Sequence, residues 1–377
     1  MGRQGFSART IRLIYLVAIP LVVVLFFTTF LGSGQPTDIP IGIVDQDYTP
    51  TTRRMARLLD AFQVPRVAGQ YTTVSDARKA IQRGEIYAFL YVPKGTTAKL
   101  IASRKPTVSF YYSVTSLTAG SLLYRDLKTI TSLANAALIQ ASLRARGATE
   151  RQIINYLQPI NIDLHQIANP VMDYNVYLST TLVPGVLTLF FFLIAAYSLG
   201  SLLKRGEGKA LLRLTHGSVL EAVMRKEMPV LIVGLLSFCA FEFYVYGVLE
   251  FPHLGGWFPI VWSALLTVVG SVGFGVFVFG LIPSLRMSMS ICSLWAVLSF
   301  SLAGSTFPVT SMDAPLEALS WLFPLRHYFM IYQAVVFNGY SVAGVWWHVV
   351  ALIIFAISPF FVLHRIKHIL LNFDYTP

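Results

Sequence analysis

Few side chains in this sequence could do chemistry, and those that stand out lie in or beside long apolar runs. Glu242 is an acid about two thirds of the way along one run, where an ionisable group is a functional candidate. It could contact a substrate or relay protons, or it could be an interfacial residue hydrogen-bonded to a neighbouring helix. Arg326 and His327 follow Pro324, and they could fix a turn through carboxylate or carbonyl contacts or act in a gate.

The remaining reactive side chains do not form a recognisable catalytic or metal site. His364 and His368 are spaced like two metal ligands on a helix, but no Glu or Cys completes the set, so we expect interfacial cations. Residues 206–210 read GEGKA, which lacks the Gly and Ser/Thr positions of a phosphate loop. Cys239 and Cys292 lie in apolar runs, where we expect packing. The sequence therefore predicts no enzyme, and no cofactor or metal on this chain.

The composition is that of a membrane protein. Of the 377 residues, 55% are hydrophobic and only 12% are charged, whereas about a quarter of a soluble domain is charged. The net charge of +11 does not indicate nucleic-acid binding, because no basic stripe is interleaved with aromatic residues.

Apolar runs predict six transmembrane helices, since each run approaches the roughly 20 residues that cross a bilayer. The runs cover residues 13–31, 178–199, 229–248, 259–282, 287–305 and 342–363. The first follows Arg3, Arg9 and Arg12 like a signal sequence, but it is long and lacks a small-residue cleavage site, so we expect an uncleaved helix. The basic residues of the short connections place both termini, including residues 1–12, in the cytoplasm.

Residues 32–176 contain no run that could span a membrane, so we expect a folded extracytoplasmic domain. Strands are predicted at 39–44, 86–92 and 107–112, with helices starting after Thr49 and Ser75 between them. This alternation predicts a small α/β unit with a largely parallel sheet. A long helix over 117–146 and a shorter one from Thr149 should follow.

A polar island at 203–228 separates the second and third runs. It is assigned to the cytoplasm by six cations, Lys204, Arg205, Lys209, Arg213, Arg225 and Lys226. Its apolar side consists of Leu211, Leu212, Leu214, Val219, Leu220 and Val223, with a break at 215–218. This pattern predicts a short amphipathic helix, a break, and a second helix lying along the membrane or docked on a cytosolic partner. A solvated basic loop is the alternative.

The segment 305–339 is too apolar for a solvated loop, yet Pro308, Pro315 and Pro324 argue against one straight span. We expect two short re-entrant helices that dip into the outer leaflet before the last span. Pro308, Pro324, Arg326 and His327 are the candidate gate residues of this segment.

Together these features resemble an ABC type-2 transporter permease, the membrane half of an ATP-driven exporter. The resemblance covers nearly the whole chain, and its most specific stretches are IGIVDQDYTPTTRRMARLLDAF at 41–62 and TFPVTSMDAPLEALSWLFPLRHYF at 306–329. It implies that ATP and Mg²⁺ bind a separate ATPase subunit and that a second permease copy or paralogue is present. Relatives with a large outer domain typically work in a Gram-negative inner membrane with a periplasmic adaptor and an outer-membrane channel.

The resemblance also locates the contact with the ATPase. Family members usually open the first cytoplasmic loop with an Arg-Glu-x-Gly-Thr-type sequence, which Arg205, Glu207 and Gly208 match except that Gly206 intervenes. By this resemblance the coupling residues are Glu207, Gly208, Leu211, Leu212, Leu220 and Glu221. Short helices at a membrane surface can transmit domain movements of this kind.

The sequence thus predicts an inner-membrane export permease that takes a substrate from the cytoplasm or the inner leaflet. The aromatic-rich outer ends of the predicted spans favour an amphipathic or lipid-like cargo. One rival is a membrane scaffold or receptor whose outer domain binds an envelope partner. A membrane enzyme is disfavoured, because paired acids, zinc-ligand spacing and a Ser/His/Asp set are all missing at membrane depth.

Overall fold

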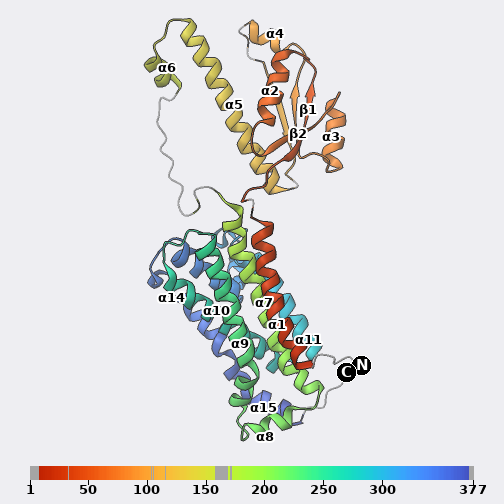
Figure 1. Cartoon of the computed structure of the whole chain (residues 1–377), viewed down its shortest axis with the longest axis vertical. Coiled ribbons are helices and arrows are strands. Elements are labelled where there is room, and N and C mark those ends of the chain that lie inside the picture. Colours follow the sequence, from red (N-terminus) through yellow and green to blue (C-terminus); the bar gives the residue numbers. More distant parts are fainter. Residues whose placement is uncertain are drawn as a thin grey trace, which may run out of the picture. The chain divides into compact units, whose positions relative to one another are not determined.

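The computed structural model describes residues 8–32, 34–102, 104, 106–114, 116–157, 169 and 172–372 of the chain. The chain divides into two compact units (Figure 1). Gln35–Leu164 form an α/β unit, and Met1–Gly34 with His165–Pro377 form a helical unit. The expected cytoplasmic segment ahead of the first helix falls largely on residues 1–7, which lie outside the described residues.

The α/β unit is built on a four-stranded sheet in the order β2-β1-β3-β4. Strand β1 pairs in parallel with β2 and β3, and β4 is antiparallel to β3. The strands are Ile39–Asp45 (β1), Pro65–Gln70 (β2), Ala88–Val92 (β3) and Ser109–Tyr112 (β4). The largely parallel sheet is confirmed. The sequence analysis missed β2, an edge strand whose PRVAGQ sequence contains proline and glycine, residues depleted in strands.

Helices cover both faces of this sheet. Leu59 of α2 and Leu123 of α5 pack on the face that carries Ile41, while Ala77 and Ala80 of α3 pack on the opposite face. The helices are Pro50–Asp60 (α2), Val74–Gln82 (α3), Thr96–Ile101 (α4), Leu117–Ala145 (α5) and Glu150–Leu157 (α6). Thr49 caps α2 as predicted, accepting the backbone N–H of Thr52 at 3.2 Å. Thr73, not Ser75, caps α3.

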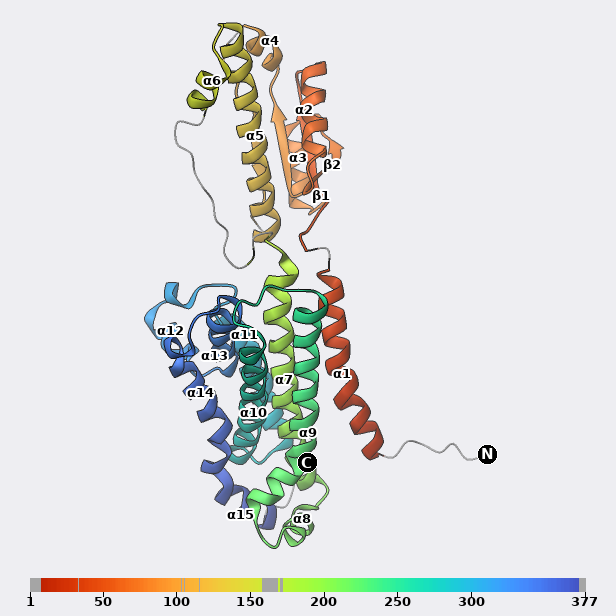
Figure 2. The ribbon, with the colours of Figure 1, turned by 60° about the vertical axis from the view of Figure 1, so that its left-hand side comes forward.

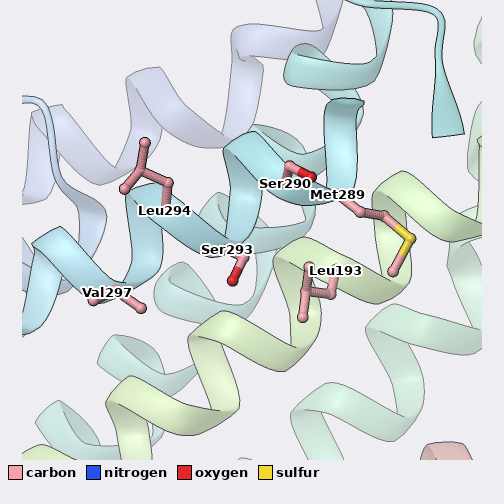
Figure 3. Close-up of a pocket in the computed structure, with 6 residues that line it drawn as sticks. All are labelled: Leu193, Met289, Ser290, Ser293, Leu294 and Val297. Carbon is pink, nitrogen blue, oxygen red and sulfur yellow. The ribbon is translucent and has the colours of Figure 1, made fainter. Parts of the chain in front are cut away.

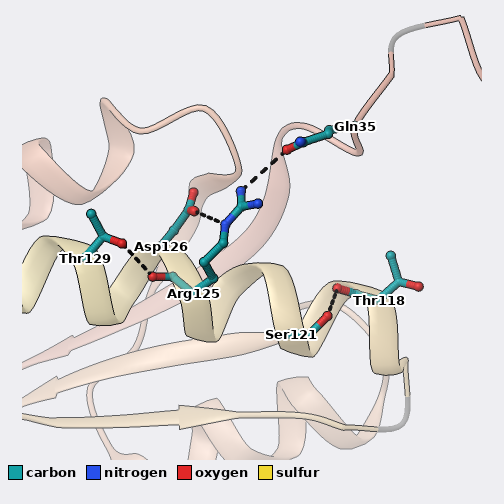
Figure 4. A network of polar contacts seen from close by, with 6 residues as sticks. All are labelled: Gln35, Thr118, Ser121, Arg125, Asp126 and Thr129. Carbon is teal, nitrogen blue, oxygen red and sulfur yellow. Dashed lines mark hydrogen bonds and ion pairs between the residues drawn. The ribbon is translucent and has the colours of Figure 1, made fainter. Parts of the chain in front are cut away.

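A polar network ties α5 to the segment that leads into β1 (Figure 4). The guanidinium of Arg125 donates to Asp126 Oδ1 at 3.1 Å and to Gln35 Oε1 at 3.4 Å. Thr129 and Ser121 donate their hydroxyls to carbonyls of the preceding turn of α5. Of these contacts, the one between Arg125 and Gln35 joins α5 to the segment ahead of β1, and the others lie within α5.

Among its described residues, the helical unit has five helices that are long and apolar enough to cross a membrane, and the protein is a multi-pass membrane protein. These spans are Tyr174–Lys204, Val219–Val248, Trp257–Leu281, Leu285–Leu302 and Trp346–Asn372. They consist of α7 (Tyr174–Lys204), α9 (Val219–Phe243) with η1 (Tyr244–Val248), α10 (Trp257–Leu281), α11 (Leu285–Leu302), and α14 (Trp346–Ile357) with η5 (Ser358–Val362) and α15 (Leu363–Asn372). The first of the six predicted spans falls on α1 (Ala8–Phe30), which has a shorter apolar stretch at Ile14–Phe30. That span remains a prediction.

The core of the helical unit forms around α10, which packs against α7, α9 and α14. Glycines on α10 permit this close packing. A Cβ added at Gly273 would lie 2.5 Å from the carbonyl oxygen of Phe355 on α14, and one at Gly275 would lie 2.8 Å from that of Phe192 on α7. Both glycines therefore serve packing inside one protomer.

The segment 305–339 forms two short helices, as predicted, namely α12 (Ala314–Ser320) and α13 (Pro324–Ile331). Short 3-10 or π turns flank them, η2 (Val309–Ser311), η3 (Tyr332–Phe337) and η4 (Val342–Gly344). Pro315 and Pro324 stand in the first turns of α12 and α13, where a missing N–H costs nothing. The depth of these helices in a bilayer remains a prediction.

The polar island also forms a short helix, α8 (Gly208–Leu214), followed by a break at 215–218. The prediction of a separate second helix after the break was wrong. Helix α9 begins at Val219 and continues through Pro229 into the apolar run. Val219, Val223 and Val230 are buried along one face, so packing holds this stretch in the span even though Pro229 removes one helical hydrogen bond.

The close approach at Gly273 gives a testable prediction. Gly→Ala normally stabilises a helix by about 0.5–1 kcal/mol, but here the new Cβ would meet backbone, so Gly273→Ala should lower the free energy of unfolding by about 1–3 kcal/mol. Gly270→Ala is the matched control, because its Cβ would lie 3.3 Å from the nearest backbone oxygen. Thermal unfolding in detergent measures both. Equal midpoints for the two variants would contradict the packing described.

Candidate functional site

Two regions of the helical unit carry the candidate residues, one around α8 and α15 and the other around α12 and α13. Figure 2 shows that they lie at opposite ends of the unit. At the first end, α7 stops at Lys204 and the chain turns through Gly206, whose φ of +66° suits glycine. Glu207 precedes α8 and pairs with Arg205 at 3.4 Å. Their side chains are 49% and 47% exposed, so this ion pair contributes little stability and leaves Glu207 accessible.

Helix α8 lies against α15 and the start of α9. Gly208 makes this possible, because a Cβ there would lie 2.7 Å from the carbonyl oxygen of Leu370 on α15. Leu212 is buried beside it in the main core. Thr215 is also fully buried, and its hydroxyl donates to backbone carbonyls around the break, including that of Ser218 at 3.0 Å.

The six predicted coupling residues separate into two groups in the structure. Glu207, Leu220 and Glu221 are exposed and could touch a partner, and Leu211 is half-buried. The prediction of a direct contact was wrong for Gly208 and Leu212, because both are buried within this chain and can only position α8. The sequence pattern could not separate the groups, since it does not say which leucines of α8 face α15.

Two exposed apolar side chains of α8 and α9 were not among the predicted coupling residues, although Leu214 was placed on the apolar side of the island. Leu214 is 62% exposed and Met224 is 42% exposed, comparable with Leu220 at 42%. Three cations of the same two helices are also exposed, namely Lys209, Arg213 and Arg225. We call this set the coupling surface: Glu207, Lys209, Arg213, Leu214, Leu220, Glu221, Met224 and Arg225.

A buried acid lies behind the coupling surface. Glu227 of α9 is 2% exposed and accepts the hydroxyl of Ser198 on α7 at 2.5 Å. The sequence analysis treated Glu227 as part of a solvated island and did not select it. Its spacing from Val219 and Val223 along one helical face was the available signal. The contact joins the two spans that α8 connects.

At the opposite end, the predicted gate residues also differ in exposure. Pro308 is exposed before η2, while Pro324, Arg326 and His327 are buried in α13. His327 Nε2 lies 2.8 Å from the carbonyl oxygen of Trp321, and His327 Nδ1 lies 2.9 Å from His348 Nδ1 on α14. A carbonyl can only accept, so His327 Nε2 carries a proton, and in the neutral ring Nδ1 then accepts from His348 Nδ1–H.

His327 therefore fixes the turn before α13 through a carbonyl, as expected. For Arg326, no hydrogen bond to a carbonyl or carboxylate is found among the described residues, although its charge interacts with the carboxylate of Glu317 on α12. Its guanidinium lies over the Trp321 ring at 5.5 Å, and its Nε and Nη1 make no hydrogen bond within the described residues. No group of three or more metal-ligating side chains occurs in the described part of the chain.

A groove of about 580 Å³ lies between two spans (Figure 3). Leu193 of α7 faces it, and α11 contributes Met289, Leu294 and Val297 together with the hydroxyls of Ser290 and Ser293. The lining is mainly apolar, and the Ser290 hydroxyl is already bonded to the Arg286 carbonyl at 2.9 Å. Such a surface suits a lipid chain or another transmembrane helix better than a polar small molecule.

The fold and these features define a multi-pass helical membrane protein with a short docked helix at one end and two short helices at the other. The family described as "ABC-2 family transporter protein" matches residues 11–363, and the chain belongs to this family. It is the membrane subunit of an ABC transporter, and membership implies association with an ABC ATP-binding subunit. The resemblance inferred from the sequence is therefore confirmed. No curated protein matches the chain.

The His327–His348 contact gives a prediction for a double-mutant cycle. His348→Phe leaves the buried Nδ1 of His327 without a donor, which should cost about 1–3 kcal/mol of unfolding free energy. His348→Asn, which can restore an N–H near the same place, should cost less. The double variant His327→Phe, His348→Phe should be destabilised by less than the sum of the single changes. Additive effects in thermal unfolding would show that the two rings do not interact.

Proposed function

We propose that the protein is the permease of an ATP-driven exporter that moves a substrate from the cytoplasm or the inner leaflet outward. The observation that carries this proposal is the coupling surface. It combines exposed apolar side chains with cations on a short helix that the rest of the chain holds in place. Exposed apolar residues rimmed by charges are typical of protein interaction sites. The partner that fits is the ATP-binding subunit.

Movement of the ATPase would reach the membrane through the contacts of α8. The helix follows α7 directly, precedes α9 after four residues, and packs on α15 at the end of the last span. A push on α8 therefore acts on three spans together. The buried Ser198–Glu227 contact, at 2.5 Å, joins two of these spans and supports their movement as one body.

The proposed contact with the ATP-binding subunit also implies an orientation of the protein in the membrane. The coupling surface would face the cytoplasm, in agreement with its cations, and both termini would lie on that side. Helices α12 and α13 would then lie at the outer end of the membrane region, and the α/β unit would be extracytoplasmic. We propose an inner-membrane location on this basis together with the family resemblance.

Other partners follow from the proposed transport cycle. A second permease copy or a paralogue would complete the membrane region, and the groove between α7 and α11 offers it apolar side chains and two serines. A periplasmic adaptor and an outer-membrane channel would receive the cargo from the α/β unit. An amphipathic or lipid-like cargo fits the apolar membrane-facing surface of α11.

The coupling surface gives a direct test of the proposal. Leu220→Asp places a charge in the apolar part of the surface, so affinity for the ATP-binding subunit should fall by about 30-fold, or about 2 kcal/mol. Leu316→Asp on α12 is the matched control, because Leu316 is 45% exposed and Leu220 is 42% exposed. Co-purification from the native membrane, with quantification of the bound ATPase, measures both.

Loss of the ATPase with Leu220→Asp alone is the expected result. Equal retention of the ATPase by both variants would move the docking site away from α8 and α9. Recovery of envelope proteins with no ATPase, even for the unmodified protein, would favour the scaffold reading.

A further inference from the structure

Glu242 lies in the last turn of α9, before η1. Figure 2 shows that this helix runs from α8 to the opposite end of the helical unit. Glu242 shares a helical face with Phe238 and Tyr246, each four residues away. This face looks toward α13, because the rings of Phe238 and Tyr328 meet at a centroid distance of 5.5 Å. Glu242 is 3% exposed, so the carboxyl belongs to the protein interior rather than to its surface. The alternative of an exposed interfacial position does not fit.

The Glu242 carboxyl has no cation to balance it. The titratable groups that interact with it are Cys239 on α9 itself, Tyr246 on η1, Tyr328 on α13 and Tyr332 on η3. Among the described residues, α1, α7 and α10, which also pack on α9, add no charged group to this set. No lysine, arginine or histidine of the described residues interacts with Glu242. Its Oε2 makes no hydrogen bond within the described residues.

A second unpartnered atom belongs to the same cluster. The Tyr332 hydroxyl is buried beside the hydroxyls of Thr180 on α7 and Tyr246, yet it forms no hydrogen bond of normal geometry with a described residue. Tyr246 and Tyr332 also both lie in π-helical turns, η1 and η3. Such turns are rare and are found preferentially at functional sites. Two of them meet at one buried acid.

An ionised carboxylate in this position is unfavourable, because among the described residues it has neither a cation nor a full set of donors. The surroundings are also tightly filled, since Phe238, Phe241 and Tyr328 have exposed fractions of 0%, 1% and 2%. A proton adds no volume and removes the charge. We propose that Glu242 is a proton-binding site, occupied in this conformation, which gives up its proton to water when α13 and η3 separate from α9 and η1.

The proton balance of this step is simple. On opening, the O–H bond of the Glu242 carboxylic acid breaks and a water molecule at that end of the unit accepts the proton. On closing, the carboxylate takes a proton back from the same side, so no net proton crosses the membrane. The link to the transport cycle rests on the proposed function, whereas the presence of the proton does not.

Infrared spectroscopy of the full-length protein in lipid nanodiscs tests the site without any transport assay. At neutral pH the unmodified protein should show the carbonyl-stretch band of a protonated carboxylic acid, and Glu242→Gln should abolish it. Glu317→Gln, which changes an exposed acid on α12, should leave the band unchanged. If Glu242→Gln does not fold, Glu242→Asp keeps an acid at this position and should shift the band. A spectrum in which none of these variants alters the band, or in which the band is missing, overturns the proposal.

A second experiment tests the link between this proton and transport, and it uses the complex of the protein with its ATP-binding subunit. Glu242→Gln should bind the ATPase normally, and the pH dependence of ATP turnover between about pH 5 and 8 should flatten. If the unmodified protein binds no ATPase, the proposed function fails while the infrared band still decides the proton site. If the band is lost in Glu242→Gln but turnover keeps its pH dependence, the proton is bound without controlling the cycle, and the proposed release on opening is wrong.

Discussion

The coupling surface depends on one close approach, that of α8 to the backbone of α15 at Gly208. A helix of seven residues is not stable in water by itself, because nucleation is costly and its few hydrogen bonds do not compensate. Helix α8 therefore exists through tertiary packing. Only glycine allows the 2.7 Å approach of a Cβ position to the Leu370 carbonyl, and this approach buries Leu212 and Thr215 behind it. The exposed residues of α8 then have a fixed position relative to three spans.

The interior of the helical unit is mostly apolar, so each buried polar group there needs a hydrogen-bond partner that can be identified. Most such groups in the helical unit are satisfied locally, as when Thr267 and Ser271 donate to carbonyls one turn back at 2.7 and 2.6 Å. The polar contacts that cross between elements are fewer, and they lie near the ends of the spans. Ser198–Glu227 joins α7 to α9 near the coupling surface, and His327–His348 joins α13 to α14 at the other end. These polar contacts thus lie where one helix must keep a fixed position along its neighbour.

The sequence predicted much of this architecture for physical reasons. Long apolar runs, prolines in the first turns of helices and a capping threonine at Thr49 act locally, so the spans, α12, α13 and α2 could be found without tertiary information. The orientation of the helical unit and the first predicted span, at 13–31, remain predictions.

The sequence could not show which side of each helix is buried against its neighbours. Leu212 and Leu214 are two residues apart with the same side chain, yet one is 4% exposed and the other 62% exposed. That difference depends on where α15 lies, and α15 is more than 140 residues further along the chain. The continuity of α9 through Pro229 was missed for a similar reason, because packing against neighbouring helices outweighed the local preference of proline.

The most direct test of the central claim is cross-linking mass spectrometry of the unmodified protein, purified with its partners from its native membrane. Lys209 is exposed on α8 and carries an amine that reacts with standard cross-linkers. The account predicts a cross-link between Lys209 and an ATP-binding subunit. A complex that contains the ATPase but whose cross-links avoid Lys209 and the rest of the coupling surface would contradict it.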